Sequence, residues 1–243
     1  MREEVNWENE DKWREFLCQL EDLISDWKGQ LADLREIFQP YDIDWLLAET
    51  VKKFDNKSCC WSCNSNLVEF VIDTGYRDEP DVDEDGKPLL RRVTAVHHAA
   101  RKQLYDWVWC WRFTYLFKVY DRFDVNYTDD SGLTHFHFAC MSDCDDVAKE
   151  FLELGQDSNL VWQETGDSPL HLALKHRQGN IVGLLLRSGA DLSLTRTEIL
   201  FCNWPRSTGT RRWLNCCREE ARPEFGQQGW RDSSALGPEA SAQ

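Results

Sequence analysis

The stretch E-T-G-D-S-P-L-H-L-A at residues 164–173 repeats, with substitutions, the stretch D-S-G-L-T-H-F-H-F-A at residues 130–139. Downstream of each stretch, V-A-K-E-F-L-E-L-G at 147–155 matches I-V-G-L-L-L-R-S-G at 181–189. All matching positions are 34 residues apart. Self-similarity at such a period predicts a row of small repeated modules, each of which buries its apolar face against the next.

The repeated pattern reads G-x-[TS]-P-L-H-x-A, then V-x-x-L-L-x-x-G-A-D, and it resembles the ankyrin repeat. Residues 160–193 match it at almost every position. The resemblance implies an all-α fold, a solenoid in which each unit contributes two short antiparallel helices. It also implies structural roles for His137 and His171, which would tie neighbouring loops together by hydrogen bonds.

The residues at the ends of the predicted helices agree with this reading. Thr134 and Ser168 stand where a side-chain oxygen can cap the first helix of a unit. Gly155 and Gly189 follow the second helix, where glycine readily adopts the left-handed exit conformation.

Two divergent units precede the clear ones. T-A-V-H-H-A-A at 94–100 fits the start of a first helix, and L-V-E-F-V-I-D-T-G at 67–75 fits a second helix and its glycine. We predict the first helix of the first unit at 44–54 and the second helix of the second unit at 112–119. The second unit holds about seven extra residues, which we place near 107–111.

The sequence therefore predicts about four units in an ankyrin-repeat domain at 41–194, with approximate boundaries 41–75, 76–126, 127–159 and 160–194. The loop at 76–93 is long and acidic. The divergent units, including V-D-E-D-G-K-P-L-L-R-R in that loop, resemble those of a group of insect ankyrin-repeat proteins.

Residues 1–40 follow another pattern. Apolar residues recur every three or four positions, ahead of Pro40, at Leu17, Leu20, Ile24, Trp27, Leu31, Leu34 and Phe38. This predicts one amphipathic helix, which either caps the first unit or self-associates as a coiled coil through residues 17–38. A seam of about three heptads is short for a coiled coil, which favours capping.

Residues 195–243 show no repeat pattern, and we predict an unstructured tail there. Read from the third base, the codons of residues 230–239 permit G-E-T-P-L-H-L-A-L-R, and those of 197–205 permit G-D-T-V-L-Q-L-A at the same offset. One hypothesis is a change of reading frame near residue 195, which would make the chain an incomplete fragment of a longer ankyrin protein. The alternative is a natural tail whose matches arise from codon degeneracy.

The composition narrows the classes of function. With 28 Lys and Arg against 43 Asp and Glu, the net charge is −15, which disfavours nucleic-acid binding by phosphate neutralisation. No apolar run is long enough for a membrane span, and the N-terminus is charged where a secretory signal would be apolar. The ten cysteines are then expected to be reduced thiols of a cytoplasmic or nuclear protein.

Candidate metal and catalytic motifs are incomplete. D-V-D-E-D-G at 81–86 opens like a calcium loop, but Arg92 stands where the bidentate glutamate belongs and Pro88 interrupts the loop. C-C-x-x-C at 59–63 lacks a second ligand pair. No nucleotide-binding or nucleophile-elbow pattern occurs, so we predict a non-catalytic protein without cofactor or metal. An enzyme or metal protein built on Cys59, Cys60 or Cys63 remains the competing reading.

The resemblance implies protein–protein interaction through loop tips and the concave face of the first helices. The candidate contact residues are exposed loop positions, namely Asp129, Asp130, Ser131, Gln163, Glu164 and Asp167, with Asp81, Asp83, Glu84 and Asp85 in the acidic loop. Arg101, Lys175 and His176 are candidates on the helices. The excess of carboxylates predicts a basic protein partner.

Overall fold

The computed structural model describes residues 10–25, 33–53, 66–102, 110–142 and 144–191. These residues form helices joined by turns and isolated bridges, without strands in the described part. The helices are α1 (Glu10–Ser25), α2 (Leu34–Ile37), α3 (Pro40–Lys53), α4 (Asn66–Asp73), α5 (Ala95–Arg101), α6 (Cys110–Val119), α7 (His135–Met141), α8 (Asp145–Glu153), α9 (Pro169–Lys175) and α10 (Gly179–Arg187). The predicted all-α fold is confirmed.

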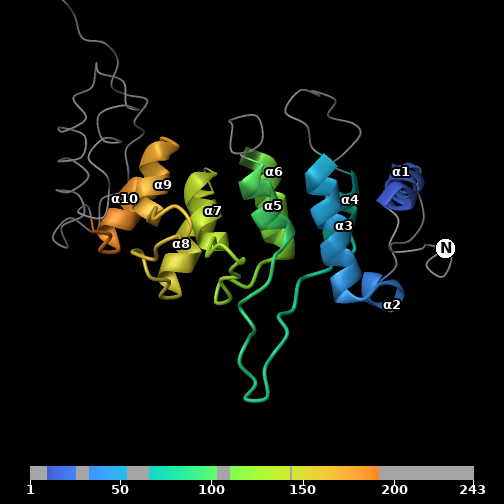
Figure 1. The fold of residues 1–243 in the computed structure, drawn as a ribbon, viewed down its shortest axis with the longest axis horizontal. Helices are drawn as coiled ribbons and strands as arrows, with labels where there is room; N and C mark the ends of the chain where they lie inside the picture. Colours follow the sequence, from blue (N-terminus) through green and yellow to red (C-terminus); the bar gives the residue numbers. More distant parts are fainter. Residues whose placement is uncertain (1–9, 26–32, 54–65, 103–109, 143, 192–243) are drawn as a thin grey trace, which may run out of the picture.

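The helices are arranged as pairs in a row (Figure 1). Each pair packs internally: α3 with α4, α5 with α6, α7 with α8, and α9 with α10. The first helices of the pairs, here termed the inner helices, contact one another in the order α3, α5, α7 and α9. The second or outer helices also meet, α4 with α6 and α8 with α10. The helices predicted at 44–54 and 112–119 correspond to α3 and α6.

The core lies between successive pairs. The inner helices carry small, fully buried residues at equivalent places, Ala99, Ala139 and Ala173. Small residues there leave room for the neighbouring inner helix to approach closely. Between the second and third pairs, the Phe151 ring lies 5.2 Å from that of Phe123 and 5.7 Å from that of Phe136, measured between centroids. Burying such a side chain stabilises the fold by about 1.5–3 kcal/mol.

The predicted caps are present. The Ser168 and Thr134 hydroxyl oxygens each accept a hydrogen bond of 3.2 Å from the backbone N–H three residues later. Gly155 and Gly189 have φ values of +87° and +86°, so the outer helices end in the left-handed conformation that glycine tolerates.

Buried histidines tie the second and third pairs to the loops that follow them. The His137 Nδ1 atom accepts a hydrogen bond of 3.2 Å from the Thr134 amide, and its Nε2 lies 2.9 Å from the Leu160 carbonyl oxygen. The His97 Nε2 atom lies 3.3 Å from the Tyr127 carbonyl oxygen in the same way. Because Nδ1 accepts and Nε2 faces a carbonyl, the proton belongs on Nε2. The structural role predicted for the histidine of the repeat is confirmed at His137.

The predicted continuous helix up to Phe38 is wrong. α1 ends at Ser25, and the backbone at Asp33 is extended, with φ −67° and ψ 114°. The Asp33 carboxylate accepts a hydrogen bond of 2.9 Å from the Arg35 amide, and this cap starts the separate helix α2. Residues 26–32 lie outside the described part of the chain.

The N-terminal apolar residues nevertheless cover the first pair. α1 packs against α4, and Leu17 and Leu34 are 1% and 5% exposed. Leu20, Ile24 and Phe38 are partly buried against the same core. The contact of α1 with α4 agrees with capping of the first pair. Capping and self-association through residues 17–38 both stay predictions.

Three further predictions fall on other parts of the chain. The parts of the chain outside the described residues include 195–243, the three cysteines Cys59, Cys60 and Cys63, and residues 107–109 of the insertion predicted near 107–111. Among the described helices, none is both long and apolar enough to cross a bilayer.

Candidate protein-docking surface

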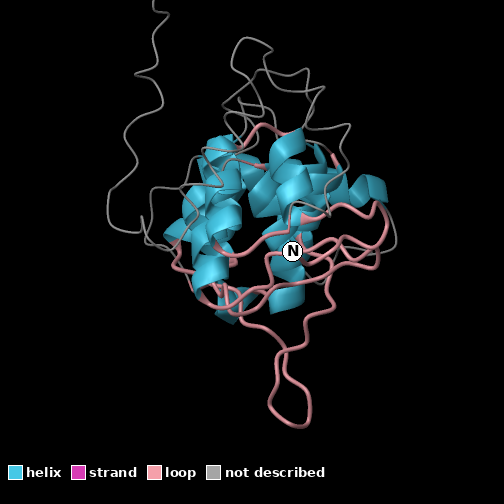
Figure 2. Cartoon of the chain, turned by 90° about the vertical axis from the view of Figure 1, so that its left-hand side faces the viewer, coloured by secondary structure: helices cyan, strands magenta, loops and turns pink. Residues whose placement is uncertain are grey.

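An acidic finger, defined here as residues 78–92, projects from the edge of the row where the loops lie (Figures 1 and 2). Its two sides are joined by backbone hydrogen bonds, 2.7 Å from the Leu89 amide to the Asp81 carbonyl and 2.8 Å from the Asp83 amide to the Lys87 carbonyl. The linking segment is therefore an ordered hairpin.

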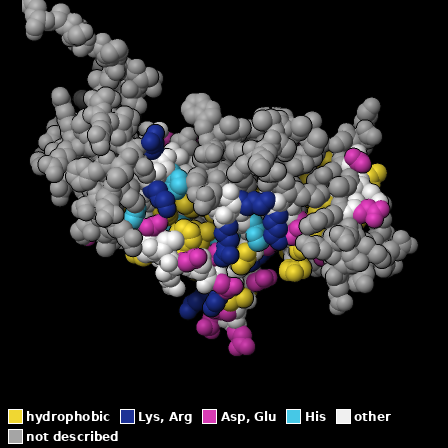
Figure 3. All heavy atoms as spheres, turned by 45° about the horizontal axis from the view of Figure 1, so that its top comes forward, with side chains coloured by type: hydrophobic (Ala, Val, Ile, Leu, Met, Phe, Trp, Pro, Cys, Tyr) yellow, Lys and Arg dark blue, Asp and Glu magenta, His cyan; other side chains and the backbone are white. Residues whose placement is uncertain are grey.

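Four carboxylates of the finger lie toward its tip. Asp81, Asp83, Glu84 and Asp85 are all exposed, and Figure 3 shows acidic side chains gathered on the projecting finger. Asp83 also shapes the tip, because its Oδ1 accepts hydrogen bonds of 3.0 Å and 2.8 Å from the amides of Asp85 and Lys87. Within the described residues, no group of three or more His, Cys, Asp or Glu side chains is placed to hold a metal ion.

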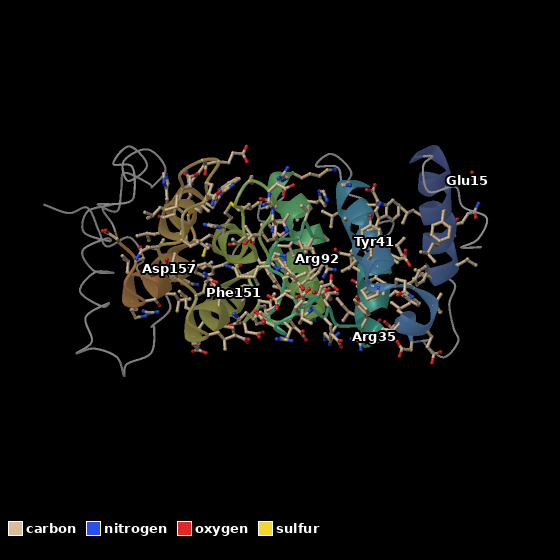
Figure 4. All side chains as sticks on the ribbon, turned by 60° about the horizontal axis from the view of Figure 1, so that its bottom comes forward. Glu15, Arg35, Tyr41, Arg92, Phe151 and Asp157 are labelled. Atoms are coloured by element: carbon tan, nitrogen blue, oxygen red, sulfur yellow. The ribbon has the colours of Figure 1, made fainter. Side chains whose placement is uncertain are left out.

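A buried charge cluster forms the root of the finger. The Arg92 Nε atom donates to Asp44 Oδ2 at 3.1 Å, and Arg92 Nη1 lies 3.0 Å from Asp78 Oδ1. The Tyr120 hydroxyl donates to Asp44, and the Tyr127 hydroxyl donates to Asp78 Oδ2 at 2.6 Å. Arg92 thus joins the finger to α3 and to the loop before α7, in the middle of the row (Figure 4).

The titration of this cluster follows from burial and mutual charge. Burial raises the pKa of Asp44, although Arg92 and Tyr120 act in the opposite direction. Burial works against the charged form of Arg92, but Asp44 and Asp78 outweigh it and raise the pKa of the guanidinium. Burial and then Asp78 raise the pKa of Tyr76 to about 12. Sequence reasoning did not find this cluster, since its charged members come from separate parts of the chain.

The loop before α7 contains one prediction that the structure corrects. Asp129 was expected to be exposed, but it is 3% exposed. Its Oδ1 accepts hydrogen bonds from the amides of Ser131 and Leu133, at 2.8 Å and 3.0 Å, because the side chain turns back to close its own loop. Asp130 is exposed and lies 3.1 Å from Arg91 at the finger root.

The loop before α9 contains the second correction. Asp167 was expected to be exposed, but it is buried, with 6% of its surface exposed. Its side chain faces the His171 ring, with 3.1 Å between Oδ1 and Nδ1. Gln163 and Glu164 are exposed, as predicted. The Glu164 amide donates to the carbonyl oxygen of the half-buried Ser131 at 3.2 Å, so these loop tips lie side by side.

The loop tips therefore form one surface with the finger. Its accessible members are Asp130, Ser131, Gln163 and Glu164 on the loops and the four carboxylates of the finger tip. Asp129 and Asp167 lie behind this surface, where they contact Arg101 and Lys175 of the inner helices. His176 is half-buried at the C-terminal end of α9.

Two cysteines with described side chains, Cys140 and Cys144, are buried. Burial, followed by the neighbouring Cys144, raises the pKa of the Cys140 thiol well above its usual range, which disfavours the reactive thiolate.

Comparison with known proteins shows what the repeated part of the chain is similar to. A family model described as ankyrin repeats (3 copies) matches residues 110–196. A stretch of 79 residues, 32% of this chain, is 33% identical to the palmitoyltransferase Hip14 of Drosophila melanogaster. That stretch spans only 12% of the relative's length.

Proposed function

From the premise that residues 110–196 match the family model of ankyrin repeats, we propose that the chain is a non-catalytic protein-interaction module that serves as an adaptor. Its docking surface is the acidic finger together with the adjoining loop tips, and its partner is a basic protein segment. The observation that carries this proposal is the finger itself, whose exposed carboxylates stand on a root fixed by the buried Arg92 cluster.

Rigidity and charge explain how such a surface would bind. The finger is held by its own backbone hydrogen bonds and by its root, so little conformational entropy is lost on docking. Asp81, Glu84 and Asp85 lie close together with Lys87 as the nearby cation. Exposed charge of one sign steers an oppositely charged partner and speeds association.

Affinity capture with the full chain tests the proposal. A finger variant replaces exposed tip carboxylates and keeps the turn-forming Asp83: Asp81→Asn, Glu84→Gln and Asp85→Asn. A control variant makes the same charge change on the exposed side of α8: Asp146→Asn, Glu150→Gln and Glu153→Gln. We expect proteins captured by the wild type to be lost with the finger variant and kept with the control. Equal capture by all three chains would refute the finger as the docking element.

Two further aspects belong to this proposal. Localisation to the cytoplasm or the nucleus is part of the proposal, in line with the expectation that the cysteines are reduced thiols. Because the aligned stretch is 12% of the Drosophila relative, such repeats can also be one part of a larger protein. A fragment without independent activity is therefore the second candidate, and it predicts that the chain captures nothing in the experiment above.

A further inference from the structure

The face of the inner helices carries ion pairs in which the cation is more exposed than the carboxylate. The exposed fractions of the two side chains are 43% and 23% for Lys52–Glu49, 50% and 0% for Arg101–Asp129, and 46% and 9% for Lys175–Asp167. The carboxylates lie behind their cations, so an approaching molecule meets positive charge first. This arrangement recurs on α3, α5 and α9, in a chain whose net charge is −15.

Lys102 adds a further cation to this face between α3 and α5, whereas the neighbouring His98 is shifted toward its neutral form. The Lys102 ammonium donates to the Lys52 carbonyl oxygen, at the end of α3 where the helix dipole is negative. The pKa of His98 is lowered first by burial and then by the positive charge of Lys52. Figure 3 shows Lys, Arg and His side chains over the row of helices, with Asp and Glu side chains between them and on the finger.

We infer that the inner-helix face binds an extended acidic segment of a partner protein. The inference rests on the proposed interaction function and adds a second surface, opposite in charge to the finger. Neighbouring helices pack about 10 Å apart, so the row from α3 to α9 spans about 30 Å. An extended chain rises about 3.3 Å per residue, so the segment that reaches all three cationic positions has about nine residues.

Charge complementarity selects the occupant. A basic segment would meet Lys52, Arg101 and Lys175 before it reached their partly or fully buried carboxylates. An acidic segment pairs with the exposed cations and leaves the internal ion pairs in place. Such contacts are weakened by salt, because the screening length falls to about 10 Å at 0.1 M ionic strength.

Fluorescence anisotropy with a labelled peptide of about ten glutamates tests the inference on the full chain. The test variant is Lys102→Glu with Lys175→Glu, on the inner helices. The matched control is Lys118→Glu with Lys149→Glu, both exposed on outer helices. Far-UV circular dichroism and urea unfolding verify that each variant is folded, and the neutral pair Lys102→Gln with Lys175→Gln serves where charge reversal prevents folding.

We expect the wild type to bind the glutamate peptide, with affinity that falls when ionic strength rises. Reversal of Lys102 and Lys175 should weaken binding by about tenfold or more, whereas the control pair should change it about twofold at most. No binding by the wild type, or equal loss in both variants, overturns the inference. If reversal instead dissociates a dimer of the wild type, the occupant is a second copy and the inference is again overturned.

A peptide of about ten lysines separates this inference from the proposed function. The finger variant should lose lysine-peptide binding and keep glutamate-peptide binding. Failure of the glutamate peptide alone rejects the inner-helix face as an acidic-segment site and leaves the finger proposal standing. Failure of the lysine peptide alone rejects the basic partner of the finger.

Discussion

Asp78 and Arg92 stand at the two ends of the finger, and an ion pair joins them with 3.0 Å between Oδ1 and Nη1. Their side chains are only 3% and 19% exposed. The same guanidinium also contacts Asp44 on α3. The finger is therefore closed at its base by charges inside the protein, and this closure connects an exposed acidic hairpin to the packed helices.

Replacing Arg92 by methionine should strongly destabilise the fold. The change leaves Asp44 and Asp78 buried without their cation, and breaking a buried pair by removing one partner costs about 3–5 kcal/mol. Urea unfolding followed by circular dichroism measures the loss. Arg91→Met is the control, since the Arg91–Asp130 pair is 79% and 76% exposed, and it should cost less than about 1 kcal/mol. Equal losses in the two variants would show that the root cluster does not stabilise the fold.

Asp129 is predicted to act in folding rather than in binding. Asp129→Ala removes the acceptor for the Ser131 and Leu133 amides, and leaving such groups unsatisfied costs about 1–3 kcal/mol each. The exposed neighbour provides the control, because Asp130→Ala should change the free energy of unfolding by less than about 1 kcal/mol. A stable Asp129→Ala protein with impaired partner capture would contradict this assignment.

Gly132 and Gly166 occupy equivalent turns. A comparison of the two separates the cost of backbone strain from the cost of a steric clash. Both have positive φ, +82° and +74°, so alanine is strained at either place. Only at Gly132 would the added Cβ lie 2.9 Å from Gln163 Cγ and 3.1 Å from the Gln163 amide nitrogen. Gly132→Ala should therefore lower the melting temperature more than Gly166→Ala does, as measured by differential scanning calorimetry. The reverse order would contradict the close packing of the two loops.

The buried histidines should make the fold sensitive to acid. Burial lowers the pKa of His97 and of His137 to about 4, and that of His135 well below its usual value. An unfolded imidazole has a pKa of about 6.5, so below that pH the unfolded chain binds more protons and the folded state loses stability.

Between about pH 7 and about pH 5, each of these three groups should lower the free energy of unfolding by about 2 kcal/mol. Urea unfolding at both pH values measures the total. His135→Leu removes one titrating group and should reduce the pH-dependent loss by about a third. Stability that stays constant over this interval would mean that the imidazoles can be protonated without unfolding.

The sequence predicted the features that recur and missed those made by single long-range contacts. Ser168 and Gly189 follow the repeat, and their capping and exit roles were readable from spacing alone. The Arg92 cluster was not, because Asp44 and Arg92 are 48 residues apart and meet only after α3 and the finger are packed.

The sequence did contain signals against two of the wrong predictions, the continuous helix up to Phe38 and the exposure of Asp129. Asp33 and Glu36 form the acidic cap pattern of a helix start, which indicates a break before Leu34 rather than one helix up to Phe38. Asp129 stands two residues before Ser131, the spacing at which an aspartate hydrogen-bonds its own backbone in a turn. The burial of Asp129 therefore follows from local chemistry.

Amide hydrogen exchange of the full chain, alone and with the captured partner, tests the central claim most directly. The account predicts that binding slows exchange in the finger at 78–92 and at the loop tips around Asp130 and Glu164. Exchange in α6, α8 and α10 should stay unchanged, because the outer helices take no part in docking. Protection confined to those outer helices, with no change in the finger, would contradict the account.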